Sequence, residues 1–262
     1  MTGLLSQMDL PHALAGLLVG VAVGLTGVGG GSLMTPLLVL IFGVSPQTAV
    51  GTDLLFAAAT KTAGSGVHGW RETINWPILR RLACGSIPAS VVTLIALSEL
   101  GRIHKGTQHV ILIVLGVMLL VTAIGAVFQK RLVAFATTRE PRDPKRMLWP
   151  TVLLGLFIGV VVSISSVGAG AVGVTALLML YPQLPVARIV GTDIAHAVPL
   201  TLVSGFGHWL IGDVDGVLLA NLLLGSIPGV IVASFISSRA PDSWLRLALA
   251  AVLVFSGIKL LT

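Results

Sequence analysis

The chain has 262 residues, of which 55% are hydrophobic and only 10% charged, and its mean hydropathy is +1.00. Soluble domains carry about a quarter of charged residues, so this composition excludes a water-soluble globular domain and indicates a protein embedded in a bilayer. The net charge of +6 comes mainly from residues 130–146, which is typical of a cytoplasmic loop, and no basic stripe with interleaved aromatic residues indicates nucleic-acid binding.

Two short helices are expected at the start of the chain. Residues 11–44 are apolar but are interrupted by glycines around residues 27–31. At ~1.5 Å per residue, an unbroken helix of that length would far exceed the ~30 Å hydrocarbon core, so we expect two pieces that meet at the glycines. Ser45 and Pro46 are typical N-cap and first-turn residues and begin a helix that extends to about Trp70. Two more apolar segments follow, at residues 74–97 and 106–128.

The second half of the chain repeats this plan. The sequence Val50-Gly-Thr-Asp53 recurs from Val190 to Asp193, and Gly85-Ser-Ile-Pro88 recurs from Gly225 to Pro228, both with an offset of 140 residues. Its apolar segments cover residues 150–166, 169–181, 184–210, 214–236 and 244–261. We predict an all-α polytopic membrane protein with two repeats of about five helical segments each, the first two of each repeat being short or re-entrant. The repeats are residues 1–129 and 148–262, joined by a basic cytoplasmic linker at residues 130–147.

The repeats have opposite orientations if each crosses the bilayer an odd number of times, and parallel ones if the two short pieces fuse into one span. Basic residues mark cytoplasmic ends. The inverted arrangement places Arg188 and Arg239 near the cytoplasm and Asp213 on the outer side. The parallel arrangement places Arg239 on the outer side and Asp213 on the cytoplasmic side. Arginine placement therefore favours inverted repeats, although Arg102 and Lys105 do not fit.

The interrupted helices predict an anion site. An unpaired backbone N–H is costly in hydrocarbon, so a break must line protein or water, and the following half-helix offers free N–H groups and a positive dipole end. Close helix packing is the alternative explanation for the glycines. No strand precedes the glycines, which argues against a dinucleotide fold. The groups expected to contact the anion are Thr26, Gly29, Gly30, Gly31, Ser32, Thr52, Ser165, Ser166, Gly168, Gly170 and Thr192.

Ionisable residues within a span are expensive and usually functional. Asp53 and His68 share one face of a predicted helix, fifteen residues apart, and Asp193 and His208 repeat this spacing. If the halves are antiparallel, Asp53 lies at the depth of His208, and Asp193 at the depth of His68. We therefore hypothesise two acid–histidine sets that flank the anion site and carry protons. Alternatively, each aspartate bonds backbone N–H groups near a helix start and each histidine lies at an interface.

Lys61 is the one lysine well inside a predicted span, and Thr201 takes its place in the second repeat. It could balance a bound anion, pair with Asp53, or extend to an interface. Ser86 and Ser226 could line the same cavity or mark simple proline kinks. His196 is a further candidate in the second half. The residues predicted to act in a proton relay or in gating are Asp53, Lys61, His68, Asp193 and His208.

No catalytic motif supports an enzyme: a nucleophile elbow, an H-E-x-x-H helix and a cysteine pair are all missing from the sequence. We expect no cofactor and no resident metal. The absence of an ATP-binding loop favours a secondary transporter driven by the substrate gradient, protons or membrane potential. The alternative function is a divalent-cation carrier, whose ligands would be Asp53, Asp193, His68 and His208.

The segment Gly24-Leu-Thr-Gly-Val-Gly-Gly-Gly-Ser-Leu-Met-Thr-Pro36 resembles the glycine-rich signature of the TauE/SafE family of membrane permeases. The Val-Gly-Thr-Asp and Gly-Ser-Ile-Pro elements, with their repeats, are similar to that family as well, so the likeness covers nearly the whole chain. The second copy departs from the signature, because Ser166-Val-Gly-Ala-Gly-Ala171 lacks the triple glycine and Ala176 replaces Pro36. We therefore do not expect the two halves to contribute equally to the anion site.

This resemblance implies transport of small sulfur-containing anions, such as sulfite, sulfoacetate or other organosulfonates, usually outward across the bacterial inner membrane. It also implies about eight spans, fewer than the ten apolar segments. The expected partners are thus a small anion and the lipid bilayer, with no nucleic acid, and a homodimer is compatible with the sequence.

Overall fold

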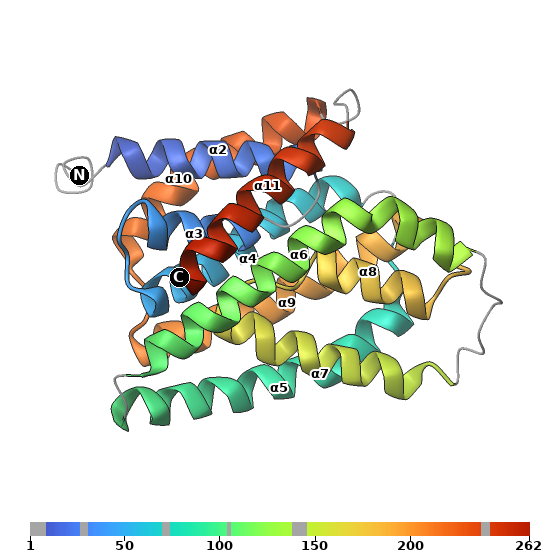
Figure 1. Cartoon of the computed structure of the whole chain (residues 1–262), viewed down its shortest axis with the longest axis horizontal. Coiled ribbons are helices and arrows are strands. Elements are labelled where there is room, and N and C mark those ends of the chain that lie inside the picture. Colours follow the sequence, from blue (N-terminus) through green and yellow to red (C-terminus); the bar gives the residue numbers. More distant parts are fainter. Residues whose placement is uncertain (1–8, 27–30, 70–73, 104–105, 138–145, 237–241) are drawn as a thin grey trace.

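The computed structural model describes residues 9–26, 31–69, 74–103, 106–137, 146–236 and 242–262 (Figure 1). These residues form ten helices and no strand, which confirms the all-α prediction. The helices are α2 (Leu10–Thr26), α3 (Gly31–Leu40), α4 (Pro46–Gly69), α5 (Trp76–Ile103), α6 (Thr107–Thr137), α7 (Leu148–Ser165), α8 (Ala171–Leu180), α9 (Val186–Ile211), α10 (Gly216–Ile236) and α11 (Asp242–Leu261).

The two halves of the chain match helix by helix, α2 to α6 against α7 to α11. In each half a short second helix of ten residues follows the break, α3 in one and α8 in the other. One boundary differs from expectation, because α6 continues to Thr137 and so includes the first residues of the predicted linker. Within the described ranges, five helices are long and apolar enough to cross a membrane, namely α5, α6, α7, α9 and α10.

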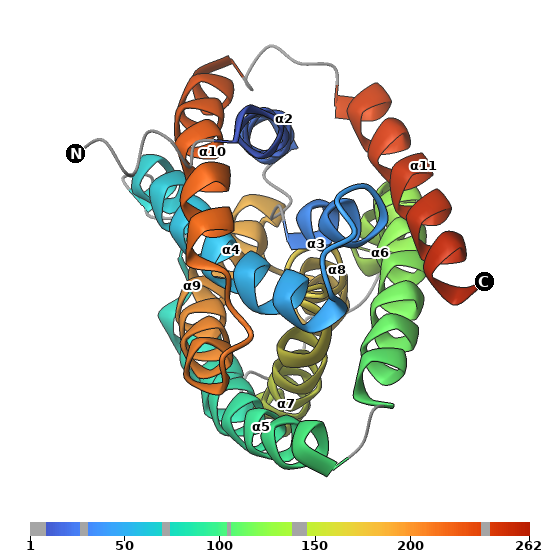
Figure 2. The same ribbon diagram turned by 90° about the vertical axis from the view of Figure 1, so that its left-hand side faces the viewer.

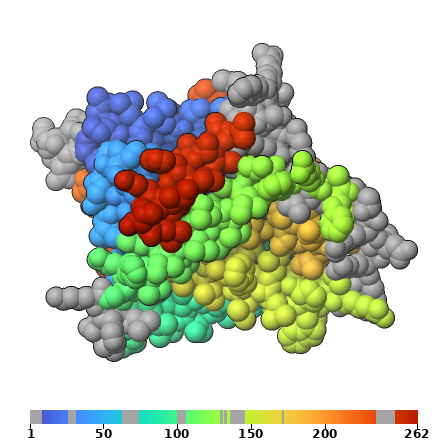
Figure 3. Space-filling view, viewed as in Figure 1, coloured from blue at the N-terminus to red at the C-terminus, as the bar shows by residue number. Residues whose placement is uncertain are grey.

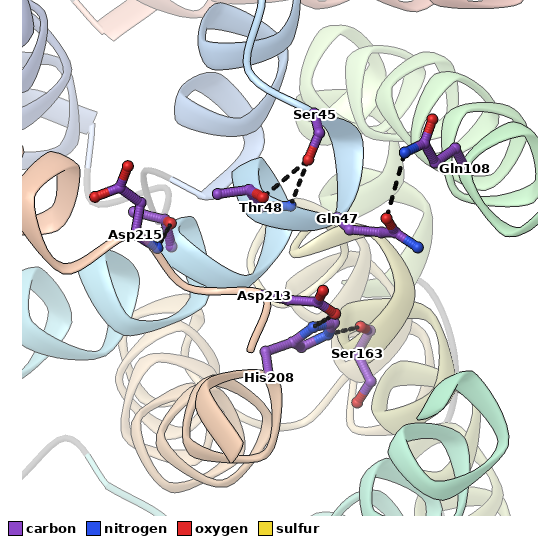
Figure 4. A network of polar contacts seen from close by, with 9 residues as sticks. Ser45, Gln47, Thr48, Gln108, Ser163, His208, Asp213 and Asp215 are labelled. Carbon is purple, nitrogen blue, oxygen red and sulfur yellow. Dashed lines mark hydrogen bonds and ion pairs between the residues drawn. The ribbon is translucent and has the colours of Figure 1, made fainter. Parts of the chain in front are cut away.

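The start of α4 is capped as the sequence predicts. Pro46 is its first residue, and the Ser45 hydroxyl accepts a hydrogen bond from the Thr48 backbone N–H at 3.3 Å (Figure 4). A serine cap satisfies an amide that has no partner inside the helix, and proline at the first position has no N–H to satisfy. This cap fixes where α4 begins, and so sets the depth of Asp53 two turns later.

Two helix pairs join the halves through very close backbone contact. Figure 1 shows α2 alongside α10 and α5 alongside α7. Glycines permit the approach: a Cβ added at Gly225 would overlap the Ala13 carbonyl of α2, and one at Gly85 would overlap the Val152 carbonyl of α7. In a bilayer, where apolar side chains gain little by leaving lipid, this kind of packing holds helices together.

The close contact of α2 with α10 gives a first prediction. Gly225→Ala should lower the stability of the fold by about 1–3 kcal/mol, the usual cost of overpacking, because backbone atoms must move apart to admit the Cβ. The measurement is the thermal unfolding midpoint of the purified protein in detergent. Gly216→Ala is the matched control, since a Cβ at that first residue of α10 meets nothing within 4 Å. Equal midpoints for the two variants would contradict the packing described.

The equivalent helices α4 and α9 run antiparallel to each other. Gly51, near the start of α4, lies against His208 at the end of α9, and the Asn75 backbone N–H, beyond the end of α4, donates to Thr192 Oγ1 near the start of α9 at 2.8 Å. The depth predicted for Asp53 relative to His208 agrees with this arrangement. The orientation of the two repeats in a bilayer stays a prediction.

The short helices α3 and α8 lie in the middle of the bundle. In Figure 2 they are surrounded by α2 and α10, by α4 and α9, by α5 and α7, and by α6 and α11. The pair α6 and α11 covers one face, as the space-filling view shows (Figure 3). Leu33 of α3 packs against the same apolar cluster as Val167 and Val172, which flank the start of α8. The two half-helices therefore begin near the same region of the interior.

Candidate functional site

The predicted break between α7 and α8 is present. Ser166 has a left-handed backbone (φ 58°), and Gly168 and Gly170 have φ values of 124° and 135°. The Ser165 hydroxyl holds the turn, because it donates to the Val161 carbonyl at 2.8 Å and accepts from the Val167 N–H at 3.3 Å. No side chain caps α8. The Gly173 N–H donates to the Gly168 carbonyl at 3.3 Å, so the amides that this helix start offers to an anion are those of residues 171 and 172.

The matching break between α2 and α3 is only partly described. Gly29 and Gly30 lie outside the described residues, as does the Thr26 side chain. Gly31 is the first residue of α3, and Ser32 is buried in its first turn. The predicted interruption itself falls on residues 27–30, which lie outside the described residues.

The carboxylate of Asp53 faces the first half-helix. Its Oδ2 accepts a hydrogen bond of 2.5 Å from Thr35 Oγ1 on α3, and Asp53 is fully buried. Ser166, from the other break, lies beside the same carboxyl group. Asp53 thus connects α3 of the first repeat with the α7–α8 break of the second.

Asp193 takes a corresponding place at the start of α8. Its Oδ1 lies directly against the Cα of Gly173, where any Cβ would overlap the oxygen. Thr35, the partner of Asp53, is the fifth residue of α3. Asp193 lies at the first turn of α8, but its Oδ1 has no hydrogen-bond partner among the described residues, so the bonding of each aspartate to backbone N–H groups stays a prediction. A negative charge is favourable at that first turn because of the helix dipole.

Lys61 is the buried cation near the two aspartates. Its side chain has 7% of its surface exposed, and its ammonium group interacts electrostatically with both Asp193 and Asp53. It also lies close enough to His196 to repel a positive charge on that ring. Lys61 is therefore an interior cation and does not extend to an interface.

Several fully buried polar atoms in this region have no hydrogen-bond partner among the described residues. They are Asp53 Oδ1, Asp193 Oδ1, His196 Nδ1 and Ser166 Oγ. Thr122 Oγ1 on α6 and Ser226 Oγ on α10 are unpaired as well. Unpaired buried polar atoms are rare and costly. Four of them on groups that interact with Lys61 or with Asp53 are the property expected of a site that is completed by a small polar ligand or by water.

Three predicted substrate hydroxyls are already engaged with backbone groups. Thr52 Oγ1 accepts from the Asp215 N–H at 3.2 Å, and Thr192 Oγ1 accepts from the Asn75 N–H at 2.8 Å. These two contacts occupy the same position in each repeat, and each attaches the loop before the fourth helix of one repeat to the third helix of the other. Together with Ser165, described above, these side chains stabilise the frame around the site.

His208 does not contact Asp53 in the structure. Its Nε2 donates to the Ser163 carbonyl at 2.8 Å, and its Nδ1 lies 3.3 Å from Asp213 Oδ2 (Figure 4). The acid beside this histidine therefore comes from the α9–α10 loop. The second predicted acid–histidine set, Asp193 with His68, lies partly outside the described residues, because the His68 side chain is not among them.

The sequence reasoning missed Thr35 as a partner of Asp53. A threonine inside an apolar half-helix, within the glycine signature, was the available signal. It also left His196 unconnected, although the structure places its Nε2 2.8 Å from Ser86 Oγ. Nothing in the sequence pairs residues 110 positions apart on different helices, so this contact required the tertiary structure.

A separate cavity of about 300 Å³ lies between α2, α3 and α11. Apolar side chains such as Leu18, Pro36 and Phe255 dominate its lining. None of the unpaired polar atoms described above belongs to a residue in this lining. An anion would lose its hydration there without replacement, so this cavity is not the polar site.

The interior of this helical bundle contains half-helix starts, buried charges and unpaired polar atoms. These features are typical of membrane transporters. The chain belongs to the sulfite exporter TauE/SafE family, which matches residues 12–260. It is 38% identical to the probable membrane transporter YjnA of Bacillus subtilis, over 97% of this chain and 100% of that protein.

More distant relatives have similar descriptions. Identity is 26% to the probable membrane transporter YdhB of Bacillus subtilis, over 93% of this chain and 96% of that protein. It is 25% to a probable membrane transporter of Xylella fastidiosa, over 86% and 83% of the two chains. No solved structure matches the chain. The protein is thus a multi-pass membrane transporter, and family and relatives alike point to a non-enzymatic one.

Proposed function

We propose that this protein is a secondary transporter that exports small sulfur-containing anions, such as sulfite or organosulfonates, across a bacterial inner membrane. The substrate class and the direction follow from the description of the family as sulfite exporters. The observation that supports an anion most directly is Lys61, a buried ammonium group that interacts electrostatically with the carboxylates of Asp53 and Asp193. A buried cation favours negative charge, and so does the uncapped start of α8.

The anion would meet donors from both repeats. Lys61 supplies three N–H donors, and the uncapped start of α8 supplies backbone amides. Ser166 Oγ is free to donate, and so is His196 Nδ1 when Ser86 donates to Nε2. From the predicted set, Gly168 and Gly170 allow close approach because they carry no side chain. Thr26, Gly29 and Gly30 remain predicted contacts.

Charge balance indicates that protons accompany the anion. Two carboxylates and one ammonium leave a net charge of −1 in a buried region, and an arriving anion would make it −2. Such an excess is expensive away from water. Protons on Asp53 and Asp193 remove it, so the anion and protons would move in the same direction, driven by the substrate gradient.

A divalent-cation carrier is the competing function. Among the described residues, no group of three histidine, cysteine, aspartate or glutamate side chains could hold a metal ion. Lys61 also interacts electrostatically with the two carboxylates that such a cation would need, and its positive charge would repel the cation. The anion transporter is therefore favoured.

Transport by purified protein in proteoliposomes decides between these functions. We expect saturable exchange of [35S]sulfite for unlabelled sulfite, faster than in protein-free liposomes and inhibited by an organosulfonate. Radioactive manganese uptake is measured in parallel and should equal that of protein-free liposomes. Manganese flux without sulfite exchange would establish the cation carrier instead.

Gly173→Ala tests the position of Asp193. The new Cβ must displace the carboxylate from the start of α8, and we expect sulfite exchange to fall by roughly 10–100-fold, as for a misplaced reactive group. Folding should survive, because the obstructing atom is the end of a side chain. Gly216→Ala again serves as the control. Normal exchange by Gly173→Ala would mean that the site tolerates Asp193 elsewhere.

A further inference from the structure

A row of buried polar side chains leads away from the central site between α5, α7 and α9. We call it the polar seam, and its members are Ser86, Ser90, Ser163, His196 and Ser204. All five are completely buried, yet each has a hydrogen-bond partner within the seam. None of them belongs to the set predicted to contact the anion.

Hydrogen bonds link these side chains into two groups. At the inner end, His196 Nε2 lies 2.8 Å from Ser86 Oγ. One turn along α5, Ser90 Oγ lies 2.8 Å from both Ser204 Oγ and Ser163 Oγ, and the last two are 3.1 Å apart. Three hydroxyls from three helices therefore meet at one point inside the bundle.

Only Ser86 of the seam has a polar equivalent in the other repeat, Ser226, and the other four members have none. At an offset of 140 residues, Phe56 stands in place of His196, Val230 in place of Ser90, and Gly64 in place of Ser204. Phe56 and Val230 are buried in an apolar cluster. Polar groups that only hold helices together would serve equally well on either side of the bundle. Their presence on one side alone therefore indicates a directional role.

The two ends of the seam carry ionisable groups. At the inner end, His196 lies near Lys61 of α4 and one turn from Asp193 on α9. At the outer end, His208 follows Ser204 by one turn and bonds the Ser163 carbonyl (Figure 4). The Asp213 side chain beside it is 25% exposed. The distance from His196 to His208 along α9 is about 18 Å.

The other neighbours of these two histidines are uncharged. α5 presents Ser86 to His196, α7 presents the Ser163 carbonyl to His208, and α4 packs Gly51 against the His208 side chain. The charged groups that bear on the seam are therefore Lys61 and Asp193 at one end and Asp213 at the other, within the described part of the chain.

We propose that the polar seam conducts protons between the central carboxylates and the face of the protein that carries Asp213. This inference rests on the proposed anion transport and names the route of its accompanying proton. A serine hydroxyl accepts a proton on its oxygen while it donates its own, so a chain of hydroxyls transfers one proton with no net change. The gaps between Ser86 and Ser90 and between Ser204 and His208 are each one helical turn, which one water can bridge.

The triple variant Ser90→Ala, Ser163→Ala, Ser204→Ala tests the route. In proteoliposomes containing a pH-sensitive dye, we expect net sulfite efflux to move protons at least about tenfold more slowly than in the unmodified protein, the low end for loss of a positioned proton-transfer group. Sulfite exchange should stay within about twofold, because exchange requires no net proton release. Thr201→Ala is the control, since its buried hydroxyl bonds only carbonyls of its own helix.

The outcomes separate this inference from the function on which it rests. An unchanged rate of proton movement during net sulfite efflux in the triple variant would overturn the seam while leaving anion transport intact. Absence of sulfite exchange in the unmodified protein would overturn both. If the triple variant fails to fold, Ser204→Ala and Ser204→Thr replace it, and the hydroxyl of threonine should restore the proton rate that alanine loses. Equal proton rates in these two variants would also overturn the inference.

Discussion

Lys61→Met should abolish sulfite transport, with exchange reduced by at least about 100-fold. Removing one preorganised group that stabilises negative charge in a buried site costs about 2.7–4 kcal/mol in rate, and each 1.4 kcal/mol corresponds to a factor of ten. The variant loses the interior cation that faces both aspartates, so the site keeps its negative charges and repels an anion. The measurement is [35S]sulfite exchange in proteoliposomes.

Two companion variants show whether charge is the cause. Lys61→Arg keeps the positive charge and should retain part of the exchange. The charge-balanced double variant Lys61→Met with Asp193→Asn should recover the thermal stability that Lys61→Met loses, but not the transport. Exchange near the unmodified rate in Lys61→Met would refute the role of Lys61 as the counter-charge of the anion.

Asp53→Asn should uncouple transport from protons. The amide has nearly the same shape and can still accept the hydrogen bond from Thr35, so the fold and sulfite exchange should survive. It cannot exchange a proton, however, and sulfite accumulation driven by a pH gradient should fall by about tenfold or more. The measurement compares sulfite accumulation with and without a gradient of 1.5 pH units. This gradient supplies about 2 kcal/mol of free energy for each proton transferred.

Asp215→Asn is the matched acid-to-amide control for Asp53→Asn. Asp215 Oδ1 accepts hydrogen bonds from the N–H groups of Val217 at 2.9 Å and Leu218 at 3.0 Å, and so caps α10 away from the centre. Asparagine caps helices equally well, so accumulation should not change. A similar loss in both variants would mean that the Asp53 effect is not specific to the buried site.

The single lysine gives the duplicated fold an asymmetric centre. The repeat places Thr201 opposite Lys61, and the Thr201 hydroxyl bonds only to carbonyls within α9. The first repeat thus supplies the cation, whereas the second supplies His196 and the polar seam. This division explains why the two glycine-containing breaks need not be identical in sequence.

The sequence alone determined the bilayer location, the ten helical segments, the interruptions and the cap at Ser45. These features follow from local chemistry: apolar length, glycines, and hydroxyls that bond amides within the same turn. It also identified Asp53, Lys61 and Asp193, because a charge inside an apolar run is visible without any knowledge of contacts.

Only the tertiary structure decided which of these groups meet. An offset of 140 residues shows that Asp53 and Asp193 are equivalent, but equivalence does not define a contact. Contacts depend on the rotation and register of packed helices, and nearby groups compete for each donor. His208 therefore pairs with Asp213, five residues along the chain, and not with Asp53. The hydroxyls of Ser90, Ser163 and Ser204 also meet only because α5, α7 and α9 pack together, since these residues lie far apart in sequence.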